Sequence, residues 1–131
     1  MRIRRLEMAG IGPFTQRQVI DFAAFDESGL FLLEGPTGSG KSTIIDALTF
    51  ALYGDVARTK DASKDRLRSN HIGDEDPSEA DLVFEVGTGI YRVTRTPAYT
   101  PAGKKSQRNS KSTLMRVVED PDAPDGWRTV E

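Results

Sequence analysis

The sequence predicts an α/β fold in which an antiparallel, β-rich sheet surrounds one strand–loop–helix unit. Three observations predict this fold. A glycine-rich motif at residues 35–43 lies between a short apolar run and a helical pattern. Two extended segments precede this unit, and an alternating pattern typical of a β-hairpin follows it. The chain therefore combines several strands with one strand–loop–helix unit.

The motif matches the spacing G-x-x-x-x-G-K-[ST], which is typical of a phosphate-binding loop. It reads Gly35-Pro36-Thr37-Gly38-Ser39-Gly40-Lys41-Ser42-Thr43. Its glycines allow tight turns in which successive N–H groups point at a polyphosphate. The spacing places the Lys41 ammonium on the β- and γ-phosphates and the Ser42 hydroxyl on Mg²⁺. The motif therefore predicts nucleotide binding, and a chance match is the alternative.

The flanking residues favour nucleotide binding over a chance match. Leu30-Phe31-Leu32-Leu33 is an unbroken apolar run that predicts a buried strand. Apolar residues recur at helical spacing over residues 41–53, at Ile44, Ile45, Leu48, Ala51 and Leu52. Gly54 then predicts the C-terminal cap of this helix. The helix would begin where its free N–H groups and positive dipole end face the phosphates.

The remaining elements are predicted in chain order. Residues 2–9 alternate as a strand with Leu6 and Met8 on one face, and residues 18–22 form a second strand. Residues 58–70 are predicted to be a polar loop with a short helix. Residues 82–95 predict a hairpin broken at Gly87-Thr88-Gly89, residues 113–118 predict a further strand, and residues 121–127 predict a turn.

Residues 97–113 are rich in Pro, Gly, Ser, Lys and Arg, and no acidic residue occurs between Thr88 and Arg116. One interpretation is a flexible basic hairpin tip whose Lys104, Lys105, Arg108 and Lys111 bind a phosphodiester backbone. The other is a mobile tip that charge keeps soluble. The sequence alone does not favour either one. The acidic residues at 73–79 lack the frame of a calcium loop and are interpreted as a solvated turn.

Composition limits the remaining possibilities. The chain has 131 residues, a net charge of −2, no cysteine and a single histidine, His71. Disulfides and thiolate metal sites are excluded, and a zinc site is not expected. No apolar run reaches the length of a signal peptide or a membrane span, so we expect a cytoplasmic location and no membrane partner. The length suits one domain or part of one.

Several parts that hydrolysis needs are missing from the sequence. Hydrolysis requires a second metal-binding carboxylate, a group that positions water, and a group that stabilises charge on the γ-phosphoryl. The run Val117-Val118-Glu119-Asp120 is a poor metal-binding strand, because Arg116 interrupts it and a proline follows. The absence of an Asn-Lys-x-Asp motif disfavours a GTPase. We therefore expect residues 1–131 to be the N-terminal part of a longer enzyme.

The chain resembles the N-terminal ATPase segment of the SbcC exonuclease subunits, which are SMC-like members of the ABC ATPases. The residues that carry the resemblance are Gly10-Ile11-Gly12-Pro13-Phe14, Ile20-Asp21-Phe22, the stretch from Leu33 to Leu48, and Ala51-Leu52-Tyr53-Gly54. Weaker similarity follows at Arg66-Leu67-Arg68-Ser69 and in the hairpin around Phe84 and Tyr91.

The resemblance implies lobe I of a split ATPase head that binds ATP and Mg²⁺. In this family the C-terminal half of the same chain returns across a coiled coil to complete the head, and two heads enclose two ATP molecules. The implied partners are the SbcD nuclease and double-stranded DNA ends, in DNA repair. The residues of the motif from Gly35 to Thr43 are the implied phosphate and metal contacts. The segment alone is expected to bind ATP weakly and not to hydrolyse it.

Other functions are compatible with the same motif. Another SMC-like ATPase of DNA maintenance, such as RecF or a condensin head, shares the core pattern. A small P-loop kinase is a further alternative, although it would need a lid and an acceptor site that this length and order do not offer. A structural module without nucleotide is disfavoured by the complete motif.

Overall fold

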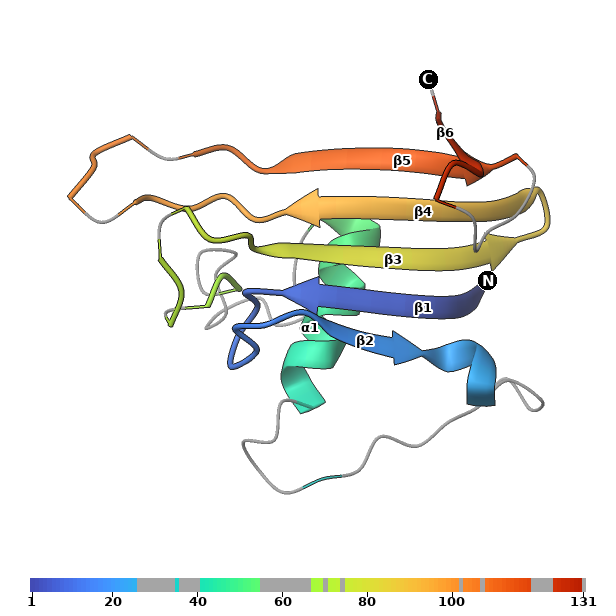
Figure 1. Cartoon of the computed structure of the whole chain (residues 1–131), viewed down its shortest axis with the longest axis horizontal. Coiled ribbons are helices and arrows are strands. Elements are labelled where there is room, and N and C mark those ends of the chain that lie inside the picture. The colour runs from blue at the N-terminus through green and yellow to red at the C-terminus, as the bar shows by residue number, and fades with distance from the viewer. Residues whose placement is uncertain are drawn as a thin grey trace.

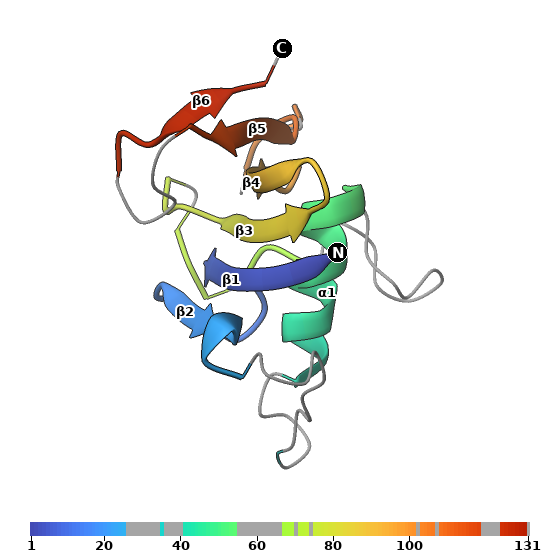
Figure 2. The ribbon, with the colours of Figure 1, turned by 90° about the vertical axis from the view of Figure 1, so that its right-hand side faces the viewer.

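A computed structural model describes residues 1–25, 35, 41–54, 67–69, 71–73, 75–101, 103–106, 108–118 and 124–130. Within these ranges, six strands form one antiparallel sheet in the order β2-β1-β3-β4-β5-β6. The strands are β1 (Arg2–Ala9), β2 (Gln18–Asp21), β3 (Glu79–Val86), β4 (Gly89–Thr96), β5 (Lys111–Val117) and β6 (Trp127–Thr129). Helix α1 (Lys41–Tyr53) lies across one face of this sheet (Figures 1 and 2).

The core lies between α1 and the centre of the sheet. Alternation puts Leu6 and Met8 of β1, Leu82 of β3 and Val93 of β4 on the face that α1 covers, and these side chains are buried. On the helix, Ala47, Phe50 and Ala51 are buried against them. The predicted bounds of β1 and α1 are confirmed, as is the predicted inward face of β1.

The predicted inward face of α1 is confirmed except at one position. Ala51 is buried and Ile44, Leu48 and Leu52 pack against the core, as predicted. Ile45 is instead 48% exposed, and Phe50, which was not predicted, is 2% exposed. Because apolar residues occur almost all around this helix, spacing alone does not select one face. Packing against the sheet selects the side that carries the small residues Ala47 and Ala51, which allow close approach.

The opposite face of the sheet carries ion pairs beside apolar side chains such as the buried Val83. Asp81 of β3 is 2% exposed, and the Arg92 guanidinium of β4 contacts its carboxylate at 2.7 Å. The Thr94 hydroxyl donates to the same carboxylate at 2.9 Å. The hydrogen bond from Arg92 to Asp81 is the main cause that raises the pKa of Arg92. Beside this pair, Arg17 bridges Glu7 and Glu79.

The predicted hairpin of β3 and β4 is confirmed, with Gly87 and Thr88 as its turn. Two other parts of the chain differ from the sequence prediction. The second strand ends at Asp21, because the Asp21 carboxylate accepts the N–H of Ala23 and begins a 3-10 helix, η1 (Phe22–Phe25). Residues 121–123 of the predicted turn at 121–127 lie outside the described residues, and residues 124–126 lead into β6. This strand was not predicted, and its Trp127 pairs with Val117.

The predicted strand at residues 30–33 and residues 36–40 of the motif lie outside the described residues, as does most of the predicted loop at 58–70. Within the described part of the chain, no helix has the length and apolar character that crossing a bilayer requires.

Candidate functional site

The N-terminus of α1 carries the described part of the predicted phosphate loop. Lys41 is the first residue of α1, and its ammonium donates to the carbonyl oxygen of Gly35. Ser42 is exposed and Thr43 is half-buried. The first turn of α1 contains no acidic residue, so its positive dipole end is not neutralised within the helix. Gly35, the first residue of the motif, therefore contacts Lys41 at the N-terminus of α1, where the positive end of the helix dipole favours an anion.

A turn between β1 and β2 packs against this helix terminus. Gly12 has a φ of +52°, and a Cβ atom there would lie 2.7 Å from Cγ2 of Thr43. The N–H of Gly12 donates to the carbonyl oxygen of Leu67 at 2.9 Å, and the N–H of Ser69 donates to that of Gly10 at 2.8 Å. Gly10 and Gly12 were part of the family resemblance, but the sequence analysis assigned them no role. Their spacing on either side of Ile11, just before Pro13, was the signal in the sequence that indicated a tight turn.

The segment that joins β4 to β5 carries the predicted DNA-binding residues. Tyr99 and Arg108 pair across it, with N–H to carbonyl distances of 3.1 and 2.7 Å. Lys104 and Lys105 are exposed in this segment. Lys111 is also exposed, but it begins β5, so residues 111–113 of the predicted hairpin tip belong to the sheet.

Arg108 is not a free cation in this structure. Its guanidinium contacts the Glu75 carboxylate at 2.9 Å and donates to the Tyr99 hydroxyl at 3.1 Å. This hydrogen bond to Glu75 is the main cause that raises the pKa of Arg108, and it lowers the pKa of Glu75. On the other side, the Arg68 guanidinium lies 3.9 Å from the centre of the Tyr99 ring. The predicted solvated turn at 73–79 therefore supplies an ion-pair partner.

Comparison with known proteins identifies the family of this chain. Residues 5–123 match the AAA domain family. The chain belongs to this family. It is 34% identical over 119 residues to the SbcC subunit of nuclease SbcCD from Staphylococcus aureus strain MRSA252, an alignment that covers 91% of this chain and 12% of the relative. The same protein from strains JH9 and Newman gives the same identity and coverage.

The family match and these relatives confirm that the chain resembles the N-terminal segment of SbcC subunits. The chain spans 12% of the length of the relatives it matches. The mixed α/β architecture with an antiparallel sheet agrees with the family.

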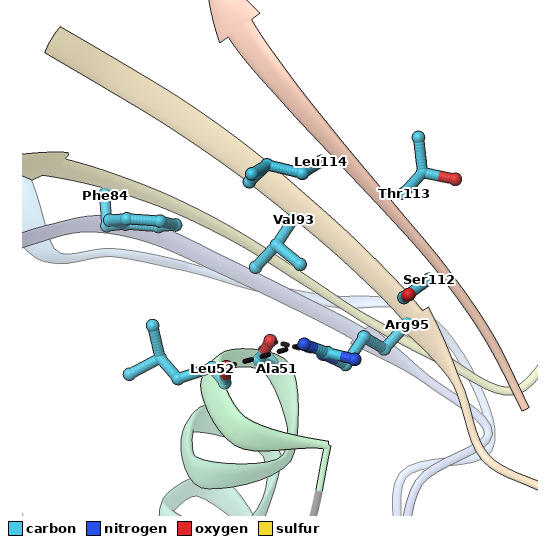
Figure 3. A pocket seen from close by; sticks show the side chains of 8 residues that line it. All are labelled: Ala51, Leu52, Phe84, Val93, Arg95, Ser112, Thr113 and Leu114. Atoms are coloured by element: carbon cyan, nitrogen blue, oxygen red, sulfur yellow. Dashed lines mark hydrogen bonds between the residues drawn. The ribbon is translucent and has the colours of Figure 1, made fainter. Parts of the chain in front are cut away.

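A pocket of about 220 Å³ lies at the other end of α1 in this AAA domain (Figure 3). Its lining is mostly apolar and includes Leu52, Phe84, Val93 and Leu114. The Arg95 side chain enters it from β4, but its guanidinium donates to the carbonyl oxygen of Ala51 at 2.7 Å. The guanidinium therefore caps the C-terminus of α1. The pocket is not part of the phosphate-loop region, since Lys41 lies at the opposite end of the helix.

Among the described residues, no group of three His, Asp or Glu side chains is arranged to hold a metal ion. Asp76 in the acidic turn accepts the N–H of Gly73 at 2.7 Å, and Glu75 pairs with Arg108. Among the described residues, the predicted metal contact is therefore the one that the motif assigns to the Ser42 hydroxyl.

Proposed function

We propose that this chain is the ATP-binding N-terminal head segment of an SbcC-type protein, acting with an SbcD-type nuclease on double-stranded DNA ends. The observation that carries the proposal is the contact of Lys41 with Gly35 at the N-terminus of α1. It brings the first glycine and the lysine of the motif together at a positive helix end. The names of the relatives favour this function over a RecF or condensin head.

The residues present fit Mg²⁺-ATP. The Lys41 ammonium already contacts an oxygen acceptor, and a phosphate oxygen would take the place of the Gly35 carbonyl. The exposed Ser42 hydroxyl would ligate Mg²⁺, and the backbone from Gly35 to Thr43 would surround the phosphates. Bound ATP supplies the phosphoryl group whose hydrolysis drives such enzymes. This chain would bind and orient it, and a completed head would supply the missing carboxylates.

Exposed apolar side chains support a head completed by more protein. Ile45 and Tyr53 of α1 are 48% and 76% exposed, and Leu114 of β5 is 37% exposed. Apolar side chains exposed on the same helix often mark a surface that another polypeptide covers. The proposed occupant is the C-terminal half of the same protein. A second head would then pair with the completed one across ATP.

The proposed DNA contacts are Lys104, Lys105, Arg108 and Lys111. The exposed positions of the three lysines support the proposal, because phosphate contacts require accessible cations. Charge reversal at Lys104 and Lys105 in the full-length protein should flatten the salt dependence of DNA binding. Unchanged DNA binding would contradict this part of the proposal.

The nucleotide site is tested by Lys41→Ala and Ser42→Ala in the full-length protein with its nuclease partner. Each should lower magnesium-dependent ATP turnover by about 10²-fold or more, the usual cost of removing a preorganised charged group. Arg128→Ala is the control, since this exposed side chain lies on β6, away from α1. Turnover that stays at the level of the control in both variants would refute the nucleotide site.

A further inference from the structure

The Glu75 carboxylate lies among cationic side chains that come from distant parts of the chain. Its partner Arg108 is 33 residues away, with Nη2 of Arg108 2.9 Å from Oε1 of Glu75. The charges of Lys104 and Arg68 also lower the pKa of Glu75, after the larger effect of the hydrogen bond and charge of Arg108. The one cation in direct contact with the Glu75 carboxylate among the described residues is therefore Arg108.

Neutral groups hold these cations in place. The Tyr99 hydroxyl and the backbone pairing of residues 99 and 108 position Arg108. Arg68 is buried, stacks on the Tyr99 ring, and donates to the carbonyl oxygens of Gly73 and Asp76 at 2.7 and 3.1 Å. The Asp76 carboxylate is engaged by the N–H of Gly73. The cationic arrangement thus has supports other than Glu75.

The pair of Glu75 with Arg108 is open to exchange. The Glu75 side chain is 80% exposed and that of Arg108 is 47% exposed. Solvent-exposed ion pairs contribute little net stability, since water and salt screen them. A phosphate offers more oxygen acceptors than a carboxylate, and an arginine can bind two of them at once.

We propose that Glu75 occupies an anion site centred on the Arg108 guanidinium, and that a phosphate of a DNA backbone displaces it. This inference rests on the proposed DNA-binding function of the segment between β4 and β5. Glu75 then weakens DNA binding, because each bound phosphate must compete with a carboxylate of the same chain. Arg108 contributes to DNA affinity only after Glu75 has left.

The test measures binding of a fluorescein-labelled DNA duplex to the full-length complex by anisotropy over a series of salt concentrations. Glu75→Gln should raise affinity at low salt about threefold to tenfold and steepen the slope of log K against log salt by about 0.9, the increment of one phosphate contact. Arg108→Gln in the Glu75→Gln background should abolish this gain, because the gain depends on the Arg108 guanidinium that Glu75 no longer occupies. Asp125→Asn removes one exposed negative charge at the other end of β5 and serves as the control.

The outcomes separate this inference from the proposed function. If Glu75→Gln behaves like Asp125→Asn while Lys104→Gln with Lys105→Gln lowers DNA affinity, the anion site is refuted and the DNA-binding function stands. If the lysine variants also leave DNA binding unchanged, the proposed DNA contacts fail as well. Inorganic phosphate is the second probe, and its binding to wild type and Glu75→Gln is followed through the NMR signals of Tyr99, which contacts Arg108. A gain for phosphate without a gain for DNA would overturn the DNA assignment of the site.

Discussion

Gly12 of the turn between β1 and β2 lies directly against Thr43 of α1. A Cβ atom at position 12 would lie 2.7 Å from Cγ2 and 2.8 Å from Oγ1 of Thr43, and the backbone φ there is +52°. The turn therefore fits the first turn of the helix only without a side chain. Thr43 follows Ser42 directly, so this contact sets the position of the helix end that carries the proposed phosphate site.

We expect Gly12→Ala to lower the free energy of unfolding by about 2–4 kcal/mol, since a left-handed backbone and an overpacked contact both oppose the methyl group. Urea unfolding followed by the fluorescence of Trp127, the single tryptophan, measures it. Gly87→Ala is the matched control, because a Cβ there meets nothing within 4 Å. Adding Thr43→Ala should recover part of the loss, and strictly additive effects would contradict a direct clash.

Arg95 fastens the C-terminal end of α1 to β4. Its Nε donates to the carbonyl oxygen of Ala51 at 2.7 Å, and its cation lies at the negative end of the helix dipole. Arg95→Ala should cost about 1–2 kcal/mol of unfolding free energy, and Arg95→Lys should cost less because the charge remains. Urea unfolding compares both with Arg128→Ala. A loss as small as that of the control would show that the cap contributes nothing.

The sequence predicted the elements whose signals are local. The alternation around Leu6 and Met8 and the Gly54 cap give the bounds of β1 and α1, and Gly54 has a φ of +74° as such a cap requires. The strand β6 was missed because Trp127 is buried through pairing with Val117, which no local pattern records.

In the candidate site, too, the sequence predicted the features that depend on local pattern and missed those that depend on tertiary contacts. The motif placed Lys41 and Ser42 at a helix N-terminus from nine consecutive residues, and the helix begins at Lys41. The pairing of Glu75 with Arg108 joins residues on opposite sides of β3 and β4 in the sequence, so only the folded sheet brings them together. The roles of Gly12 and Arg68 depend on the same tertiary contacts.

The buried ion pair of Asp81 and Arg92 should respond unequally to removal of each partner. The Asp81 side chain is 2% exposed, whereas that of Arg92 is 30% exposed and can reach water. Arg92→Met should therefore cost about 3–5 kcal/mol by leaving a buried carboxylate unpaired, and Asp81→Asn should cost less. Urea unfolding of both variants measures the difference. Equal losses would contradict the role of burial.

The pKa of Glu75 should lie below its ordinary value of 4.5, because Arg108 donates a hydrogen bond to its carboxylate and adds a nearby positive charge. The pair therefore stabilises the folded state above the unfolded pKa, and this contribution is lost as the pH falls through the lowered folded pKa. Arg108→Gln should return the pKa upward, while Arg128→Gln should leave it unchanged. Titration of the Glu75 carboxyl carbon by NMR measures the pKa, and no shift in Arg108→Gln would contradict the pairing.

The exposed side of α1 provides the last prediction, which concerns the proposed completed head. Ile45 on α1 and Val19 on β2 are 48% and 57% exposed, but Val19 pairs with Glu7 and lies on the sheet face opposite α1. If further chain covers α1, Ile45→Glu in the full-length protein buries a charge and should lower both thermal stability and ATP turnover. Val19→Lys should leave both unchanged, since the added cation faces Glu7 and a surface substitution usually costs no more than about 0.5 kcal/mol. Equal behaviour of the two variants would mean that this side of the helix remains in solvent.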